Sequence, residues 1–216
     1  MLRGPNRGPS GRLEFTNPLA ADGDGFIFTD GFDPPPASEY RPGPHEIEAN
    51  GQGEIMDRAE YLKGVNDFMY QGEVFGEAVL DCYVHLEKDP ERRYKFGTVL
   101  QLESETKARL RPFLTRLGLS IAQNDVRAQV APFAESFVSK TWRQHMEELV
   151  GITSFYIDKF QAIADASPDS EREVTQSMVV HEKAIKRFAE LELAGDSANS
   201  LNDIIAQLNY PLERPR

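Results

Sequence analysis

Ionisable side chains interrupt two apolar stripes whose spacing of three and four residues is typical of helices. The first stripe has Glu103 and Thr106 as its polar members and comprises Phe96, Val99, Glu103, Thr106, Leu110, Phe113 and Leu117. The second has His181 as its polar member and comprises Val174, Met178, His181, Ile185 and Phe188. Burying an unpaired carboxylate is costly in free energy, so Glu103 is expected to have a cation, a proton or a metal ion as its partner.

Two further glutamates extend these stripes into a repeated pattern. The two patterns are Glu73, Glu103 and Thr106 in the first half of the helical region, and Glu148, Met178 and His181 in the second half. In each pattern the second residue follows the first by 30 residues, and the third follows the second by three. Glu73 and Glu103 also lie at similar distances from the predicted turn near Asp89, so both are expected at the same depth of a helical hairpin.

These patterns resemble the ferritin-like superfamily, and its rubrerythrin-like di-iron carboxylate branch in particular. In that family the first and third helices each carry a glutamate, and the second and fourth carry Glu-x-x-His, all projecting inward to hold two metal ions. The segment Gln71-Gly72-Glu73 with Gly76-Glu77 also resembles the first helix of this group. The resemblance covers about residues 56–193 and implies the metal ligands Glu73, Glu103, Glu148 and His181.

Two positions depart from the family pattern. Thr106 stands where the family has histidine, and Met178 stands where it has glutamate. Threonine is a poor iron ligand, and a thioether is too soft for Fe(II) or Mn(II) among oxygen ligands. The remaining ligands predict either one Fe, Mn or Zn ion or two ions with gaps filled by other groups, which are Glu77, Glu105, Glu182 or water. His145, Glu77 and Thr106 are second choices as ligands, and Thr106 could instead hydrogen-bond a water or peroxide at the metal.

Ordinary structural roles are the alternatives for the same side chains. Glu73 and Glu103 could pair with Lys107 or Arg109, because buried charges are usually paired. His181 could be a satisfied core histidine. Glu182 is expected on a solvated face of the helix together with Lys183, Lys186 and Arg187.

The elements that would position these residues are helices. Periodic apolar residues predict helices over residues 56–87, 91–117, 131–166, 171–193 and 200–208, with Pro132 in the first turn of the third helix. No stretch alternates with a period of two residues, so no sheet is expected. Short links pair the first helix with the second and the third with the fourth. The predicted fold is therefore all-α, an antiparallel four-helix bundle with a short C-terminal helix.

The ends of the chain differ from this helical region. Residues 1–55 hold 8 of the 14 prolines and 9 of the 16 glycines, which predicts an extended or disordered N-terminal arm. The bundle with its fifth helix is expected over residues 56–208, and residues 209–216 form a tail. The net charge of −11 disfavours nucleic acid and anionic membranes as partners, and no apolar run is long enough to span a bilayer. The one cysteine, Cys82, fits a reducing compartment and predicts a cytoplasmic protein.

Together these observations predict a ferritin-like metal-binding protein that uses Fe or Mn. As an enzyme it would be an oxidoreductase acting on oxygen, peroxide or iron. The chain has no Cys-x-x-Cys pair, so electrons would come from an external reductant, such as a partner protein. The alternative is a non-catalytic bundle that serves as an interaction or assembly module. A homodimer is expected, because dimers are the commonest oligomers.

Overall fold

The structure, a computed structural model, describes residues 56–215, so the predicted arm at residues 1–55 lies outside the described residues. The chain divides into two units, Met1–Tyr40 and Arg41–Arg216, and every described residue belongs to the second. The described part is all-α and contains no strand. Its helical elements are α1 (Arg58–Gly64), η1 (Val65–Tyr70), α2 (Gln71–Leu86), α3 (Pro90–Arg116), α4 (Arg127–Phe137), α5 (Trp142–Asp165), α6 (Asp169–Ala194) and α7 (Asn202–Ile205).

The first predicted helix, residues 56–87, is helical in the structure, but a π-helical segment separates two α-helices within it. Asp57 and Glu60 form a reciprocal capping box that starts α1. The backbone then continues through η1, a π-helical segment, into α2. Segments of π-helix occur often at functional sites. This one ends just before Glu73, which lies in the first turn of α2.

The second predicted helix is confirmed as α3. The Asp89 side chain accepts a hydrogen bond from the Arg92 N–H, and Pro90 occupies the first turn, where its missing N–H is not needed. The helix ends near Gly118, whose φ of 72° is in the left-handed region that glycine adopts readily. α3 packs against α2 across the short link at residues 87–89.

The third predicted helix, residues 131–166, is wrong as a single helix. The structure has two helices here, because Thr141 and Gln144 form a second capping box that starts α5 anew after a turn. The first of them, α4, starts earlier than predicted, at Arg127, so Pro132 lies in its interior instead of in a first turn. α4 packs on α2, where the rings of Phe133 and Phe75 meet edge to face at 5.5 Å.

The C-terminal elements follow the prediction more closely. α6 packs along α5 and ends at Gly195, which has a φ of 83°. The predicted helix at residues 200–208 is shorter than expected and is α7. The segment after it is held on α3, because the Glu105 carboxylate accepts hydrogen bonds from the backbone N–H groups of Asn209 and Tyr210.

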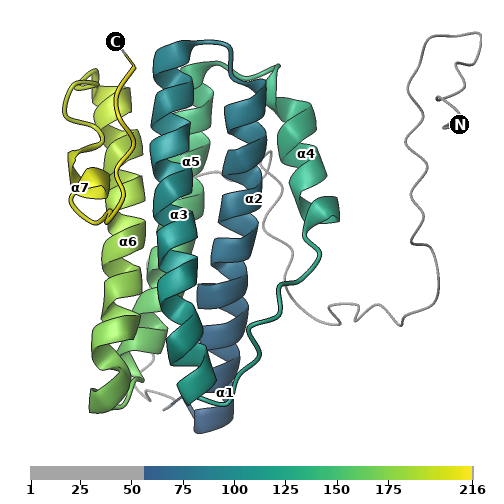
Figure 1. The fold of residues 1–216 in the computed structure, drawn as a ribbon, viewed down its shortest axis with the longest axis vertical. Coiled ribbons are helices and arrows are strands. Elements are labelled where there is room, and N and C mark those ends of the chain that lie inside the picture. Colours follow the sequence, from purple (N-terminus) through teal and green to yellow (C-terminus); the bar gives the residue numbers. More distant parts are fainter. Residues whose placement is uncertain (1–55, 216) are drawn as a thin grey trace, which may run out of the picture. The chain divides into compact units, whose positions relative to one another are not determined.

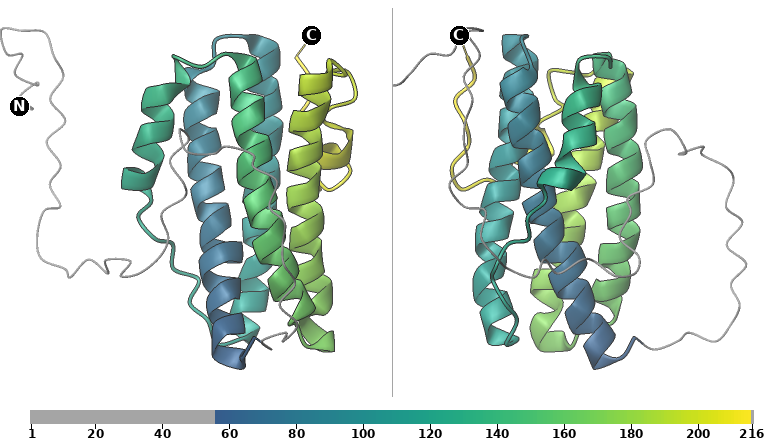
Figure 2. Two further views of the ribbon diagram at one scale, coloured as in Figure 1. Left: turned by 180° about the vertical axis from the view of Figure 1, so that it is seen from behind. Right: turned by 90° about the vertical axis from the view of Figure 1, so that its right-hand side faces the viewer.

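The long helices α2, α3, α5 and α6 run alongside one another, and α4 lies on the outer side of α2 (Figure 1). The two further views agree on this arrangement (Figure 2). The apolar core lies between these helices and includes Phe96, Leu102, Met146, Ile185 and Phe188. Among the described residues, no helix is both long and apolar enough to cross a membrane.

Candidate metal centre

Three helices bring a histidine and three glutamates together in the interior. Glu73 comes from α2, Glu103 from α3, and His181 and Glu182 from α6. All four are buried, with His181 fully enclosed and Glu73 1% exposed. The His181 Nε2 atom lies 3.4 Å from Glu73 Oε1 and 3.8 Å from Glu103 Oε2. Glu73, His181 and Glu182 each offer one ligand atom within 4.8 Å of the others, which is close enough to share a cation.

A threonine hydroxyl orients the imidazole of this cluster. Thr106 Oγ1 lies 3.2 Å from His181 Nδ1, and both residues are buried. When the ring proton sits on Nδ1, it is donated to Thr106 Oγ1, and the Nε2 lone pair faces the glutamates. Metal-binding histidines are typically held in this way by a partner on the second ring nitrogen. Thr106 therefore contacts His181, whereas the sequence pattern predicted it as a second-choice ligand or as a partner for a water or peroxide at the metal.

Burial makes these four residues unusual electrostatically. It raises the pKa of Glu73 well above its ordinary value, and the neighbouring Glu103 raises it further. Burial also raises the pKa of Glu103 to about 7 and that of Glu182 well above its usual range. The same desolvation lowers the pKa of His181 to about 3. The cluster therefore favours a neutral imidazole and protonated carboxyls until a cation replaces the protons.

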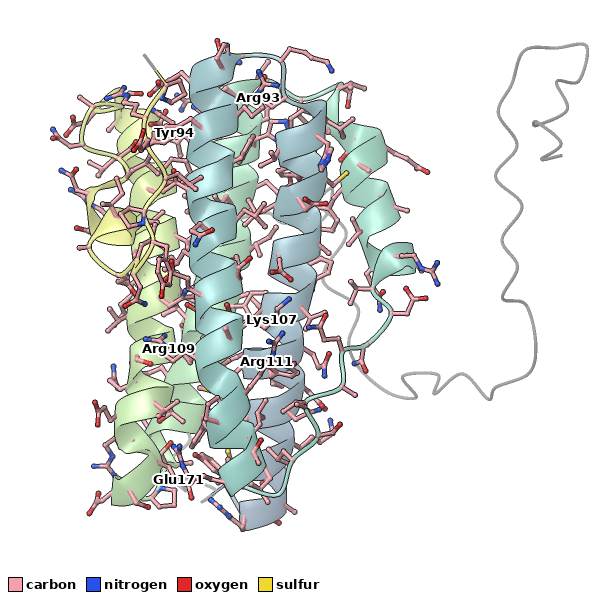
Figure 3. The ribbon with its side chains drawn as sticks, viewed as in Figure 1. Arg93, Tyr94, Lys107, Arg109, Arg111 and Glu171 are labelled. Carbon is pink, nitrogen blue, oxygen red and sulfur yellow. The ribbon has the colours of Figure 1, made fainter. Side chains whose placement is uncertain are left out.

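Neither of the two cations that could have paired with these acids forms an ion pair with them, although the charge of Arg109 lowers the pKa of Glu73 somewhat. Lys107 forms an ion pair with Glu77 of α2, and Figure 3 places Arg109 on the opposite side of α3. Within residues 56–215, no lysine or arginine forms an ion pair with Glu73, Glu103 or Glu182. Two atoms of the cluster, Glu73 Oε2 and His181 Nε2, are buried without a hydrogen-bond partner. Pairing with Lys107 or Arg109 is therefore not the solution found in this structure.

The other residues that the sequence pattern nominated lie outside the cluster. Both carboxylate oxygens of Glu148 accept hydrogen bonds from Lys140 Nζ, each at 2.8 Å. Glu77 accepts a hydrogen bond of 2.6 Å from the Ser104 hydroxyl besides its pairing with Lys107. His145 is buried among aromatic rings, with its ring centroid 4.6 Å from that of Phe137. The structure thus brings Glu73, Glu103 and His181 together, but not Glu148.

The residue that the sequence reasoning undervalued is Glu182. The expectation that it lies on a solvated face is wrong, because Glu182 is 7% exposed, whereas its neighbours Lys183 and Arg187 are exposed. A signal for its burial exists in the sequence. Glu182 belongs to a second stripe with spacings of four, three and four, which consists of Met178, Glu182, Ile185 and Ala189, all buried.

The donor set fits a hard or borderline divalent cation. Carboxylates suit Mn(II), Mg(II) and Ca(II), and a combination of carboxylates with one imidazole suits Fe(II) or Mn(II). The unpartnered Glu73 Oε2 and His181 Nε2 atoms are the observation that favours a cation over internal pairing. Glu73, His181 and Glu182 have ligand atoms close enough to share one ion, and Glu103 lies beside His181.

The space for the Glu103 side chain depends on a glycine of α2. A Cβ atom at Gly76 would lie 2.9 Å from Glu103 Oε2 and 3.0 Å from its Cδ. We expect Gly76→Ala to displace this carboxylate and to weaken Mn(II) binding about 10- to 100-fold, the range seen when support of a metal ligand is lost. The fold should survive, because alanine is the better helix former by about 1 kcal/mol. Titration with Mn(II) measures the effect.

Gly97→Ala is the matched control for this experiment. Gly97 lies in α3, and a Cβ there would meet Leu212 Cδ1 at 3.4 Å, an ordinary contact. This variant should bind Mn(II) as the unchanged protein does. Equal affinities of the Gly76→Ala and Gly97→Ala proteins would show that the position of Glu103 does not matter for the metal.

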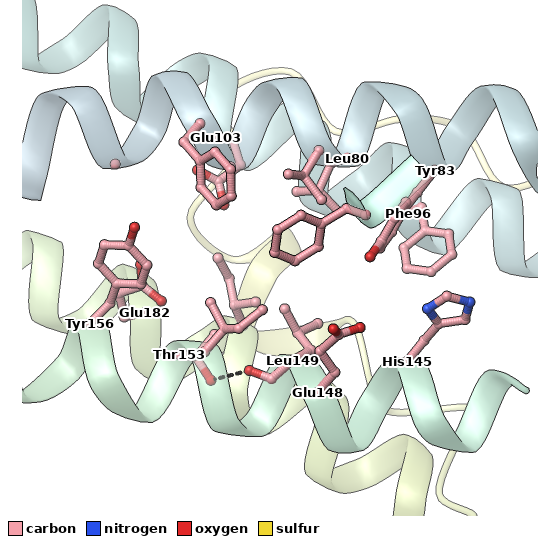
Figure 4. Close-up of a pocket in the computed structure, with 17 residues that line it drawn as sticks. Leu80, Tyr83, Phe96, Glu103, His145, Glu148, Leu149, Thr153, Tyr156 and Glu182 are labelled. Carbon is pink, nitrogen blue, oxygen red and sulfur yellow. Dashed lines mark hydrogen bonds between the residues drawn. The ribbon is translucent and has the colours of Figure 1, made fainter. Parts of the chain in front are cut away.

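A pocket of about 70 Å³ begins beside the cluster and extends along the interior (Figure 4). Glu103, Glu182 and Tyr156 line one end, and Tyr83 and His145 line the other. Apolar side chains such as Phe75, Leu80 and Ile185 line the stretch between the ends. The candidate metal centre is therefore next to a mainly apolar pocket.

In comparisons with known proteins, no protein-family model matches the chain, and neither a curated protein nor a solved structure is significantly similar to it. The function is therefore inferred from the geometry and the chemistry of the site.

Proposed function

We propose that this chain is a ferritin-like four-helix bundle that binds one Fe(II) or Mn(II) ion. The ligands in this proposal are Glu73, Glu103, His181 and Glu182. The observation that carries it is a fully buried histidine whose Nε2 atom has no hydrogen-bond partner and faces two buried carboxylates. The side-by-side course of α2, α3, α5 and α6 supports the bundle.

One ion is proposed instead of two, because the residues that would complete a second site are unsuited or engaged. Glu148 is held by Lys140, and Glu77 is held by Lys107. Met178 is buried, but its thioether is too soft for a hard cation. Thr106 hydrogen-bonds His181. Four donor groups therefore remain for the metal.

An iron or manganese ion in this position would supply redox chemistry with oxygen or peroxide. The chain's own residues would bind and orient it: three carboxylates compensate its charge, and Thr106 fixes the imidazole. The apolar walls of the pocket, including Phe75 and Ile185, would limit access of water. An external reductant and a homodimer remain part of the proposal on sequence grounds.

The test compares two glutamine substitutions that distinguish the structural ligand set from the sequence pattern. Protein purified without chelator or affinity nickel is loaded with Fe(II) under anaerobic conditions, and bound metal is measured by elemental analysis. The unchanged chain should retain about one ion, and Glu182→Gln should lose it, because one of the few anionic donors becomes neutral. Glu148→Gln is the matched control, because Glu148 lines the same pocket but is paired with Lys140.

The two variants distinguish the proposed ligand set from that of the sequence pattern. Metal lost from Glu148→Gln but kept by Glu182→Gln would replace the proposed set by the ligand set of the sequence pattern. An unchanged chain that retains no Fe(II) and no Mn(II) would refute the metal function.

A non-catalytic bundle is the second candidate, and one observation favours it. The carboxyl groups of Glu73 and Glu103 lie close enough to influence each other's pKa, so a proton shared between them would satisfy both without any metal. In that case the cluster is a proton-satisfied polar core, and the chain acts as an interaction or assembly module. Retention of the fold with no metal uptake is the result that selects this alternative.

A further inference from the structure

A tyrosine of α5 directs a hydroxyl group that no role proposed so far uses towards the candidate metal centre. Tyr156 is 7% exposed, and its Oη atom is buried without a hydrogen-bond partner among the described residues. Its ring lines the same end of the pocket as Glu103 and Glu182, and Figure 4 shows the hydroxyl group directed away from α5, towards Glu103. A buried hydroxyl group without a partner is costly in free energy, so its position in a pocket indicates a ligand that would accept its hydrogen bond.

The surroundings of the Tyr156 ring hold this hydroxyl group in position. The ring packs against Phe155 and Phe160, whose centroids lie 5.5 Å and 5.7 Å from its own. A Cβ atom at Gly72 of α2 would lie 3.3 Å from Tyr156 Cε1, so the glycine leaves the room that the ring occupies. A donor that is already held in place loses little conformational freedom when a ligand binds, which favours binding.

The electrostatic surroundings of Tyr156 keep its proton in place. Burial raises the pKa of Tyr156 well above its ordinary value. The negative charges of Glu182, Glu103 and Glu73 raise it further. The phenol therefore stays a hydrogen-bond donor at neutral pH. These carboxylates lie near enough to act on its charge, but the hydroxyl group hydrogen-bonds none of them.

These features restrict the chemistry of a ligand at this end of the pocket. The ligand must accept a hydrogen bond beside several carboxylates, and an anion can do so only where a cation compensates their charge. This inference therefore rests on the proposed metal function. Four donor groups would leave two positions open on an octahedral ion. The pocket volume of about 70 Å³ is roughly twice the 30 Å³ that one water molecule takes up in the liquid, so the ligand must be small.

We propose that the metal-loaded site binds a small anion of two or three non-hydrogen atoms, and that the Tyr156 hydroxyl group donates a hydrogen bond to it. The anion lies between the ion and Tyr156, at the end of the pocket lined by Glu103 and Glu182. The hydrogen bond compensates part of its charge within a mainly apolar pocket. Tyr156 thereby favours an anion with a lone pair on the side of α5 over an apolar molecule of the same size.

The test uses azide, a linear anion of three atoms, as the probe. Calorimetry gives its affinity for the Mn(II)-loaded protein, which should fall about 10- to 100-fold in Tyr156→Phe, because one hydrogen bond to a charged ligand is lost. Tyr83→Phe is the matched control, because it removes a hydroxyl group at the other end of the same pocket, and it should keep the affinity. The infrared stretching band of bound azide responds to a donated hydrogen bond, so it should shift in Tyr156→Phe and stay in place in Tyr83→Phe.

Elemental analysis of the same samples distinguishes this inference from the function on which it rests. Tyr156→Phe should hold as much Mn(II) as the unchanged chain, because Tyr156 is not one of the proposed ligands. Equal azide affinities of the three loaded proteins, or no binding of azide to the loaded unchanged chain, would overturn the role of Tyr156 while the metal function stands. If none of the samples held metal, the metal function would be refuted and this inference with it.

Discussion

Replacing His181 with leucine is expected to abolish the stabilisation of the chain by Mn(II) and to leave the metal-free fold at least as stable as before. In the unchanged protein, metal at about 100 times its Kd should add about 2.7 kcal/mol to the free energy of unfolding. His181→Leu removes the imidazole ligand, so the same addition should have almost no effect. Thermal or denaturant unfolding with and without Mn(II) measures both quantities.

The stability of the metal-free variant follows from the surroundings of His181. The side chain is fully buried, and its Nε2 atom has no hydrogen-bond partner. An unsatisfied buried polar atom costs about 1–3 kcal/mol, and leucine removes that cost. The substitution also leaves the Thr106 hydroxyl without its partner, which acts in the opposite direction. Combining His181→Leu with Thr106→Val removes this second term and should give the more stable protein.

His85→Leu provides the comparison for this experiment, because His85 lies on the exposed surface of α2 and is 72% exposed in its side chain. This variant should keep the full response to Mn(II). A loss of several kcal/mol in metal-free His181→Leu, together with an unchanged chain that ignores Mn(II), would mark His181 as a structural histidine.

The parts of the site that the sequence could predict are those that interrupt a clear apolar stripe. Glu103 and His181 are the ionisable members of otherwise largely apolar stripes at helical spacing, and burial of these positions follows directly from the periodicity. The all-α class follows from the same signal. The change of winding at Val65–Tyr70 has no comparable signal, because a π-helical segment is built from the same residue types as its neighbours.

The position of Glu148 shows why spacing along the chain was not sufficient to predict which residues form the cluster. In a continuous helix over residues 131–166, Lys140 and Glu148 would be about 12 Å apart along the axis, too far for an ion pair. The helix instead stops after Phe137 and restarts at Trp142, and Lys140, in the turn between them, reaches Glu148. The break therefore removes Glu148 from the set of free carboxylates. Instead of Glu148, it is Glu182 that lies near His181 and Glu73, and the apolar stripe to which Glu182 belongs can be recognised in the sequence.

The second large effect is expected in the pH dependence of the metal-free protein. Glutamine at position 103 should remove about 3 kcal/mol of the loss of stability that the unchanged chain undergoes as the pH rises from about 4.5 to 7. The loss arises because burial raises the pKa of Glu103 from 4.5 in the unfolded chain to about 7 in the fold. Below pH 4.5 the group is protonated in both states and has no effect. Above that value the unfolded chain releases its proton first, which favours unfolding.

His181 should lower the stability of the metal-free fold as the pH falls. Burial lowers its pKa from 6.5 to about 3, so its contribution to stability is complete above pH 6.5 and is lost as the pH falls towards 3. The metal-free chain should therefore be most stable between these two losses. In Glu103→Gln the loss with rising pH should shrink, and the loss with falling pH should remain. Denaturant unfolding at a series of pH values in the presence of a chelator measures both sides of this profile.

Bound metal should reverse the way in which stability depends on pH at the higher pH values. Since the carboxylates must lose their protons to bind a cation, Mn(II) should stabilise the unchanged chain more strongly as the pH rises through 7. Glu148→Gln makes the same chemical change outside the cluster and should keep the profile of the unchanged protein, with and without metal. If Glu103→Gln and Glu148→Gln gave the same pH profile, the Glu103 carboxyl would not be the group whose charge destabilises the metal-free fold. It would then also not be the group whose charge the metal compensates.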